Sequence, residues 1–455
     1  MEEKRSNKKN TSRRDFIKKT SLGAAGLTIG AMGFPAKSYA RIIGANDRMN
    51  IALIGLGRRY GSYLPPIGDK NNNVHLKYLC DVMDSQLDKA SANVKKKFGL
   101  KPQREKDMMK IFDDSEIDAV FIATPDHWHT PAAILALQRG KHVYVEKPIS
   151  HNPYEGEMLV EAQRKYGKVV QMGNQQRSSL ESQEVVKDIH NGAIGHPYLA
   201  VAFYTNSRGR TPKQVIQAPP KGLDWEMWQG PALHHEYAYN TWDYNWHWYG
   251  WNYGTAETGN NALHELDIAR WALQVSIPEE VYVEAKKQHF LDDGWEMYDT
   301  MEATFKYGDD KIIKWDGKSR NGYDTYRGGR GTIIYGSEGS VFVNRSGYKM
   351  FDRKGKIIKE STSAIKESGT ALGGGGDLST MHVNNFFDVI RGKTTKQNSP
   401  VDEGVTSTLL CHLANISYRT DSKLRLNCSN GHIMNNNSAM KLWRRDYEKG
   451  WEPKI

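Results

Sequence analysis

The sequence predicts an α/β protein: a doubly wound parallel sheet comes first, and an α+β domain with an open, mostly antiparallel sheet follows. Two observations predict the first sheet. Five short apolar runs between residues 49 and 174 alternate with helix-like segments, and the first run ends in a glycine-rich turn. One observation predicts the second sheet: beyond residue 280, strand-like runs follow one another with turn signals between them.

The predicted parallel strands are MNIALIGLG, HLKYLCDV, AVFIATP, HVYVEKP and VVQMGNQQ. The segments that lie between them and have helical character are Asp84 to Phe98, Pro131 to Arg139 and Tyr154 to Tyr166. Strands that alternate with helices at this spacing form a parallel sheet, and such sheets bind ligands at the carboxyl ends of their strands. The first domain is therefore expected to carry a ligand site at that edge.

The turn GLGRRYG follows the first strand and is typical of a dinucleotide site in a Rossmann domain. Gly55 allows a tight turn, Gly57 allows the backbone to approach a pyrophosphate, and the next helix would direct its amino end at the phosphates. The third glycine of the fingerprint is displaced, because Tyr60 stands in its place. Asp81, at the end of the second strand, would bind the ribose 2′-hydroxyl and repel a 2′-phosphate. NAD is therefore favoured over NADP, although Arg58 and Arg59 complicate that choice.

The stretch VEKP places Glu146 and Lys147 directly after a buried strand. A lysine at such a strand end is poorly solvated, and burial lowers the pKa of a lysine into the range of an acid or base. The structural alternative is a lysine that pairs with a carboxylate at a domain edge. The chemical interpretation makes Lys147 a proton carrier and lets Glu146 orient it or the ribose.

Three motifs in this order resemble the Gfo/Idh/MocA family of oxidoreductases: ATPDHWH, the lysine of EKP, and HELDIARW from His264. The resemblance runs from about Met49 to the carboxyl end. It implies an NAD-dependent oxidoreductase in which Lys147 is catalytic and His264 meets the substrate hydroxyl. The cofactor-binding residues that we assign are Gly55, Gly57, Arg58, Asp81, Thr124, Pro125, His129, Glu146, Lys147 and Asn174.

Residues 225–271 hold seven of the twelve tryptophans, with the densest part in TWDYNWHWYGWNYG. We expect a long structured loop whose aromatic faces stack on a sugar ring, the alternative being an aromatic plug under a loop. Many members of the family have an aspartate at the position of Asn260, and an amide cannot act as a base there. The substrate-binding residues that we assign are Arg177, Trp246, His247, Trp248, Asn260, His264 and Asp267.

The amino terminus has the layout of a twin-arginine signal peptide. Arg13 and Arg14 precede a weakly apolar run, and small residues precede an expected cleavage after Ala40. The domains we expect are therefore a signal peptide at 1–40, an NAD-binding Rossmann domain at 41–174, and a substrate-binding α/β domain with C-terminal helices at 175–455. The expected location is the periplasm, and the expected partners include the twin-arginine translocation machinery.

Composition excludes other classes of partner. Residues 1–40 contribute +6 of the net charge of +10, so the remaining chain is only mildly basic and no nucleic-acid partner is indicated. Cys80, Cys411 and Cys428 are too few and too widely spaced for a disulfide framework or a cysteine zinc site. The pairs His127/His129 and His234/His235 lack the acid frame of a metal motif, so no metal is expected.

These features predict a periplasmic oxidoreductase that acts on a carbinol of a sugar or glycoside and carries tightly bound NAD. Because the twin-arginine route exports folded proteins, the cofactor would travel inside the protein. One alternative is a redox-neutral glycosidase or lyase that transiently oxidises C3 and eliminates the aglycone. Another is a carbohydrate-binding protein without activity. We also expect a homo-oligomer formed through the open sheet.

Overall fold

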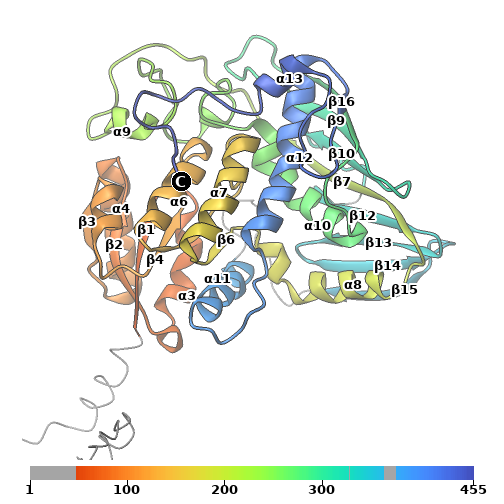
Figure 1. The fold of residues 1–455 in the computed structure, drawn as a ribbon, viewed down its shortest axis with the longest axis horizontal. Coiled ribbons are helices and arrows are strands. Elements are labelled where there is room, and N and C mark those ends of the chain that lie inside the picture. Colours follow the sequence, from red (N-terminus) through yellow and green to blue (C-terminus); the bar gives the residue numbers. More distant parts are fainter. Residues whose placement is uncertain (1–47, 327, 363–375) are drawn as a thin grey trace, which may run out of the picture. The chain divides into compact units, whose positions relative to one another are not determined.

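Six parallel strands form the first sheet, in the order β3-β2-β1-β4-β5-β6, which confirms the predicted doubly wound arrangement (Figure 1). The chain reverses direction across the sheet between β1 and β4, which pair in parallel. The crevice at such a switch point is the usual ligand site in this architecture. The strands are β1 (Met49–Ile54), β2 (Val74–Cys80), β3 (Gln103–Glu105), β4 (Ala119–Ile122), β5 (His142–Val145) and β6 (Val170–Met172).

The computed structural model describes residues 48–326, 328–362 and 376–455. The predicted signal peptide at residues 1–40 lies outside the described residues. Met49–Ile455 forms one compact unit, and it contains both sheets. Within the described residues, no helix has the length and apolar character needed to cross a bilayer.

Successive residues of the central strands alternate between two cores. Ala52 and Ile54 belong to a core shared with α5 (Met108–Asp113), α6 (Asp126–Gln138) and α7 (Pro153–Tyr166). Ile51 and Leu53 face the opposite core, which contains α3 (Leu64–Gly68), α4 (Asp84–Phe98) and the late helix α11 (Gly376–Ile390). The first sheet is thus covered on both faces, and a segment from near the carboxyl end completes one of them.

The segment after the glycine turn differs from the expected helix. It forms a 3-10 turn, η1 (Tyr60–Tyr63), followed by the five-residue α3. Pro65 and Pro66 lie at the start of α3 and cannot donate backbone hydrogen bonds, so they limit a longer helix here. The phosphates would therefore meet backbone N–H groups of a short turn rather than the end of a long helix.

The second sheet has the order β15-β14-β13-β12-β7-β10-β9-β8-β16, with β11 paired to β7. It is mostly antiparallel, as predicted, and among the described strands of this second sheet β7 and β10 are the pair that runs parallel. Helices α8 (Leu180–His190), α10 (Leu263–Leu273) and α12 (Val401–Thr420) contact strands of this sheet. The strands are β7 (Pro197–Ser207), β8 (Glu280–Lys286), β9 (Thr300–Lys306), β10 (Ile312–Lys318), β11 (Arg320–Asn321), β12 (Arg330–Gly336), β13 (Gly339–Asn344), β14 (Gly347–Asp352), β15 (Ile357–Thr362) and β16 (Leu424–Arg425).

The tryptophan-rich region between β7 and α10 is largely irregular, as the sequence indicates. It contains α9 (Trp225–Gln229), the 3-10 turn η4 (Asn245–His247) and a π-helical turn, η5 (Thr258–Ala262), that runs directly into α10. Such π turns occur often at functional sites because they leave backbone groups without helical partners. The remaining short helices are η2 (Lys70–Asn72), η3 (Gln175–Ser178) and α13 (Asn437–Lys441).

Candidate active site

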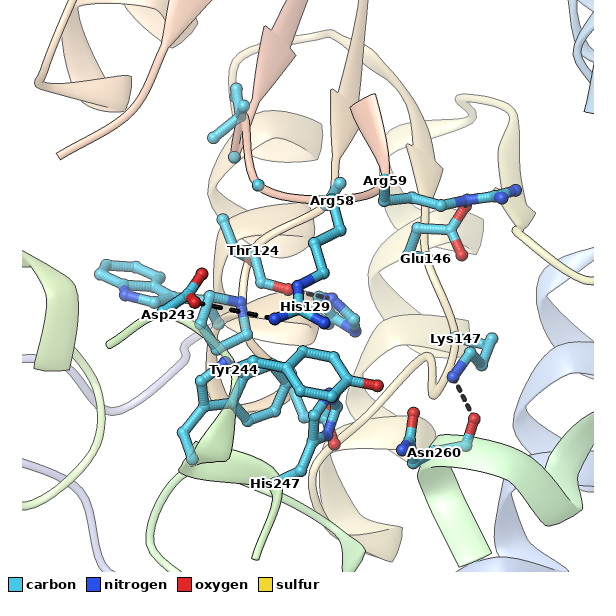
Figure 2. A pocket seen from close by; sticks show the side chains of 18 of the residues that line it. Arg58, Arg59, Thr124, His129, Glu146, Lys147, Asp243, Tyr244, His247 and Asn260 are labelled. Carbon is cyan, nitrogen blue, oxygen red and sulfur yellow. Dashed lines mark hydrogen bonds and ion pairs between the residues drawn. The ribbon is translucent and has the colours of Figure 1, made fainter. Parts of the chain in front are cut away.

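A single cavity brings together the strand ends of the first sheet, the irregular region and the start of α10 (Figure 2). One part of its wall comes from the glycine turn and Asp81. Another comes from Lys147, Asn260 and His264. The cavity therefore contains the candidate cofactor residues and the candidate proton carriers together.

The glycine turn is built closely against β4. Gly55 has φ of +85°, and a Cβ there would lie 2.5 Å from the carbonyl oxygen of Ala123, so only glycine fits. A Cβ on Gly57 would meet nothing within 4 Å. Asp81 is fixed beside this turn, since its carboxylate accepts hydrogen bonds from Leu56 N (2.7 Å) and Met83 N (2.9 Å). This close turn and fixed carboxylate fit a dinucleotide.

Asp81 is sequestered from water. Burial raises its pKa to about 6, while the backbone N–H groups of Leu56 and Met83 oppose the rise. The carboxylate is thus ionised at neutral pH and becomes protonated in mildly acidic solution. Only the ionised form leaves both carboxylate oxygens as acceptors for the ribose hydroxyls, because the protonated acid turns one of them into a donor.

The two arginines of the turn lie in different surroundings (Figure 2). Arg58 lies over the ring of Tyr244, with its guanidinium carbon 4.0 Å from the centroid, and its nearest carboxylate is Asp243 at 3.7 Å. Arg59 donates to Glu146 at 2.8 Å and to Ser379 at 3.1 Å. Arg58 therefore joins the turn to the irregular region, and Arg59 neutralises a carboxylate of the first domain.

Glu146 is held by donors on several elements. Its Oε1 accepts from Arg59, from Tyr63 Oη (2.7 Å) and from Gln175 Nε2 (3.1 Å). Burial alone would raise the pKa of Glu146, but the charge of Arg59 holds it below the usual value. Gly173 packs against this carboxylate, since a Cβ there would lie 2.7 Å from it. Glu146 is thus an ionised, immobilised group, and it does not pair directly with Lys147.

His129 lies between two backbone carbonyls. Its Nδ1 is 2.6 Å from the oxygen of Pro148, and its Nε2 is 2.8 Å from the oxygen of Thr124. Both partners accept only, so the ring links the segment after β4 to the segment after β5. Thr124, Pro125 and His129, which the sequence assigns to the cofactor, all line the cavity.

Lys147 points toward the π-helical turn, where its ammonium donates to the carbonyl oxygens of Asn260 (2.5 Å) and Gly259 (3.4 Å). The altered hydrogen-bond pattern of a π turn exposes such carbonyls to a side chain. Burial lowers the pKa of Lys147 to about 8, against the raising effect of Asp126 and Glu146. A lysine with this pKa can both accept and return a proton near neutral pH.

His264 faces the same cavity from the first turn of α10. Its Nδ1 lies 3.0 Å from the side-chain oxygen of Asn174. Burial and the positive charges of Arg345 and Lys147 hold its pKa well below the usual value, so the ring is neutral. With Nδ1 donating to Asn174, Nε2 carries the lone pair and can accept a proton.

Asn260 is oriented by a buried carboxylate that the sequence did not reveal. Its Nδ2 donates to Glu257 Oε1 at 3.2 Å, which leaves its own oxygen as an acceptor on the cavity wall. Glu257 also accepts from Asn261 Nδ2, Trp248 Nε1 and Ser319 Oγ. Although burial opposes ionisation, Arg208 holds the pKa of Glu257 below its usual value. Asn260 is thus a fixed hydrogen-bond acceptor.

The tryptophans divide between the two expected roles. Trp228, Trp242 and Trp246 line the cavity. Trp248 instead stacks on Trp295, with ring centroids 4.3 Å apart, and it is absent from the cavity wall. The irregular region therefore combines an aromatic wall with a packed aromatic plug.

Three further predicted residues lie outside the cavity wall. Arg177 and Asp267 form a buried bidentate ion pair at 2.7 and 2.9 Å, and Asn174 acts behind His264. Three arginines that sequence analysis missed do line the cavity: Arg208, Arg330 and Arg345. Their positions on or beside β7, β12 and β13 are far from the motifs, and no local pattern marks them. Asp126, also missed, lies within the ATPDHWH motif.

The histidine pairs have local partners. His127 Nε2 lies 2.9 Å from the oxygen of Trp228, and His234 Nε2 lies 3.0 Å from the oxygen of Gly230. Within the described part of the chain, no three His, Cys, Asp or Glu side chains are grouped as metal ligands.

Comparison with known proteins agrees with this geometry. Residues 49–174 match the model of the GFO_IDH_MocA family, described as an oxidoreductase family with an NAD-binding Rossmann fold. Among solved structures, the chain resembles the WlbA dehydrogenase from Bordetella pertussis in complex with NADH and UDP-GlcNAcA (TM-score 0.60, 20% identity, 84% of this chain and 99% of that one). It also resembles an aldose-aldose oxidoreductase from Caulobacter crescentus complexed with glycerol (TM-score 0.62, 16% identity, 83% and 100%). At these identities, the likeness establishes the fold.

Sequence relatives match over part of their length. Inositol 2-dehydrogenase 4 of Saccharopolyspora erythraea is 28% identical over 199 residues, which is 44% of this chain and 54% of that protein. A glycosyl hydrolase family 109 protein of the same organism is 28% identical over 210 residues (42% and 45%). The D-glucoside 3-dehydrogenase of Escherichia coli is 27% identical over 169 residues (34% and 42%). The chain spans about half the length of these relatives.

Proposed function

We propose that this chain, whose residues 49–174 match the model of the Gfo/Idh/MocA family of NAD-binding oxidoreductases, oxidises or reduces a carbinol carbon of a sugar or glycoside. The observation that carries the proposal is the cavity that Gly57, Asp81, Lys147 and His264 line together. Bound NAD would supply the hydride acceptor. The protein would supply a fixed base beside the carbinol and the orientation that makes transfer efficient.

Lys147 or His264 takes the hydroxyl proton in this proposal. The ring of His264 is neutral at pH 7 and offers Nε2, whereas Lys147, with a pKa of about 8, is mostly the ammonium at pH 7 and accepts a proton increasingly well as pH rises through 8. A positioned base of this kind contributes about 10²–10⁴-fold to the rate. Asn260 would accept a hydrogen bond from a second hydroxyl, and Trp228, Trp242 and Trp246 would contact the ring.

NAD rather than NADP is the proposed cofactor. The ionised Asp81 would repel a 2′-phosphate. Arg59, which could have offset that repulsion, is engaged by Glu146. Arg58 is stacked on Tyr244. The eight other assigned cofactor residues that line the cavity keep their roles in this proposal, whereas Asn174, which lies outside the cavity wall, acts through His264.

Export in the folded state through the twin-arginine route is part of the proposal, and it rests on Arg13, Arg14 and the small residues before Ala40. Because little free dinucleotide is expected outside the cytoplasm, the cofactor would stay bound, and each turnover would have to restore it.

Self-association through the second sheet is proposed as well. Size-exclusion chromatography with light scattering tests it, and a monomer at micromolar concentration contradicts it.

The experiment has two parts. Mass spectrometry of the small molecules released by denaturing periplasmic protein should find NAD or NADH at about one per chain. Turnover of the Lys147→Met variant should then fall at least about 10²-fold with cofactor content unchanged. Protein that is empty and also fails to bind added NAD would favour a carbohydrate-binding protein without activity. Unchanged turnover in Lys147→Met would remove that residue from the mechanism.

A second candidate is a redox-neutral glycosidase, favoured by the similarity to glycosyl hydrolase family 109 proteins. Oxidation of C3 would acidify the C2 proton, a base would remove that proton, and the C1–oxygen bond to the aglycone would break. Addition of water and return of the hydride to C3 would complete the cycle. Incubation of nitrophenyl glycosides in D₂O distinguishes the two: release of nitrophenol with deuterium at C2 and no net NADH indicates cleavage, whereas 3-keto product indicates oxidation.

A further inference from the structure

A second cavity lies outside the candidate active site. Its wall comes from the segment before α7, from α12, from residues 251–255 and from the carboxyl-terminal segment 441–446. It shares no lining residue with the first cavity. The polar side chains that matter here are those of His151, Arg419, Lys441, Arg444 and Arg445.

Buried nitrogens without partners mark one side of this cavity. Arg445 donates through Nε to Glu155 at 2.9 Å and through Nη2 to the oxygen of His127 at 2.7 Å, but its buried Nη1 has no hydrogen-bond partner. Both ring nitrogens of His151 are likewise buried and unpartnered. Leaving a buried polar group unpaired destabilises the folded protein. A ligand with acceptor oxygens would remove this cost.

Basic side chains surround the opening of the second cavity. Arg419, Lys441 and Arg444 are exposed, and Asp446 is the carboxylate on the same wall. Arg444 pairs with Glu452, whereas Arg419 and Lys441 form no ion pair within the described residues. Arg419 is held over the ring of Trp251, with 4.8 Å from its guanidinium carbon to the centroid. The cavity thus keeps two positive charges that no protein carboxylate neutralises.

The amino end of α7 adds to the positive electrostatic potential in the second cavity. Asn152 caps this 14-residue helix, and His151, Asn152 and Pro153 line the cavity. Its first N–H groups already have acceptors, since Tyr154 N donates to Trp443 O and Glu155 N to Asn152 Oδ1. The helix therefore contributes the positive end of its dipole rather than free donors.

We propose that this second cavity binds a tetrahedral oxyanion, phosphate or sulfate, either free or as a substituent on a carbohydrate. Arg445 Nη1 and His151 would donate from the buried side, and Arg419 and Lys441 would supply charge at the opening. A tetrahedral group presents acceptor oxygens in several directions, which matches donors that converge from different elements.

The oxyanion site contacts the candidate active site through two short links. Thr255 lines the second cavity, and its hydroxyl donates at 2.6 Å to Asp126, which lines the first. Arg445 bonds the carbonyl of His127, whose neighbour Trp128 lines the first cavity. An anion held here would thus be one residue away from the active-site wall on the first path and two residues away on the second.

The test is isothermal titration calorimetry of NAD-saturated protein, so that any pyrophosphate site is already filled. Sodium sulfate and sodium phosphate are titrated at constant ionic strength against a chloride background, and glucose 6-sulfate is compared with glucose. We expect one saturable site per chain. Arg419→Gln/Lys441→Gln should weaken binding by about tenfold or more. The matched control Arg353→Gln/Lys354→Gln removes the same exposed charges between β14 and β15 and should leave affinity unchanged.

The outcomes separate the sources of the anion. Binding of free sulfate or phosphate identifies a free oxyanion, and binding of glucose 6-sulfate alone identifies a carbohydrate substituent. His151→Leu, which removes one of the two buried donors and leaves the basic side chains in place, should weaken the binding of either kind of probe by a similar factor. The proposal is overturned if no probe shows saturable binding, or if both double variants lose affinity to the same extent. We expect NAD content and turnover to stay unchanged in these variants, because none of the substituted residues lines the first cavity, so failure here is distinct from failure of the proposed function.

Discussion

The side-chain oxygen of Asn174 lies 3.0 Å from Nδ1 of His264, and this contact fixes which ring nitrogen faces the cavity. Asn174 follows the last strand of the first sheet, and His264 begins the helix that packs on the second sheet. The hydrogen bond therefore joins the two parts of the molecule at the site where the proposed proton transfer occurs. It also assigns a positioning role to a residue that never touches the cavity.

The first prediction concerns this contact. Asn174→Leu should lower kcat about 10-fold or more, because His264 would lose the acceptor that selects its tautomer. KM should change less, since Asn174 does not line the cavity. Steady-state kinetics measures both. Asn174→Asp keeps the acceptor and should restore much of kcat; a KM effect without a kcat effect would contradict the positioning role.

The second prediction is the pH dependence that Lys147 imposes. Its pKa is lowered to about 8, so the neutral amine that accepts a proton becomes the major form above pH 8. Sugar oxidation should therefore accelerate as pH rises through about 8. The reverse reduction needs the ammonium, and it should slow over the same interval.

Rate profiles in both directions, measured with wild type and Lys147→Met, check this dependence. The limb near pH 8 should vanish in the variant. Because the pKa of His264 lies well below its usual value, His264 produces no limb near pH 8. A limb that survives in Lys147→Met would assign the titration to another group.

Much of this site could be predicted from local sequence. The glycine turn, Asp81, Lys147 and His264 each follow a recognisable strand or begin a helix, so the topology alone brings them to one edge. Glu257 and the π turn beside it could not be predicted, because their effect depends on which side chains they meet. Arg177 and Asp267 show the reverse case: the sequence assigns both to the substrate, but they pair with each other away from the cavity wall. Charge alone does not distinguish a buried ion pair from a substrate contact.

The third prediction tests the carboxylate behind Asn260. Asn260→Asp would place a second acid against Glu257 Oε1, where the amide now donates. Two buried carboxylates repel, so the free energy of unfolding at pH 8 should fall by about 1–3 kcal/mol. The loss should shrink as pH falls toward 5, because protonation of either acid restores a donor.

Urea unfolding at pH 5 and pH 8 measures the effect. Asn430→Asp is the matched control, since exposed Asn430 uses only its oxygen, as acceptor for His432 N at 3.0 Å. That variant should leave the free energy of unfolding nearly unchanged at both pH values. If Asn260→Asp loses the same stability at both pH values, the cause is altered packing and not charge repulsion.

The fourth prediction concerns Arg59 and Glu146. Arg59→Met should destabilise the fold by about 3 kcal/mol, because it leaves a buried carboxylate uncompensated. The pKa of Glu146 is lowered in the folded protein, so its stabilising contribution is present above the pKa of the unfolded chain and is lost as acid protonates it. The difference between wild type and Arg59→Met should therefore diminish below about pH 4. Adding Glu146→Gln to Arg59→Met should recover stability, and a double-mutant cycle without coupling would exclude the pair as a stabilising unit.

The last prediction uses Asp81 to test cofactor choice. Its pKa is raised to about 6 by burial, so the carboxylate is ionised at pH 8 and largely protonated at pH 5. Only the ionised form accepts from both ribose hydroxyls without donating a proton of its own, so NAD should bind progressively more weakly as pH falls through about 6.

The variant Asp81→Asn removes the titrating charge. It should weaken NAD binding at pH 8, abolish the pH dependence near 6 and reduce discrimination against NADP, because the repulsion of the 2′-phosphate is gone. Calorimetric titration of refolded, nucleotide-free protein with NAD and NADP at pH 5, 6, 7 and 8 provides the measurement. Preference for NADP in the wild type would contradict NAD as the proposed cofactor. Arg58, whose guanidinium lies beside the same turn, would then be the residue to test for contact with the 2′-phosphate.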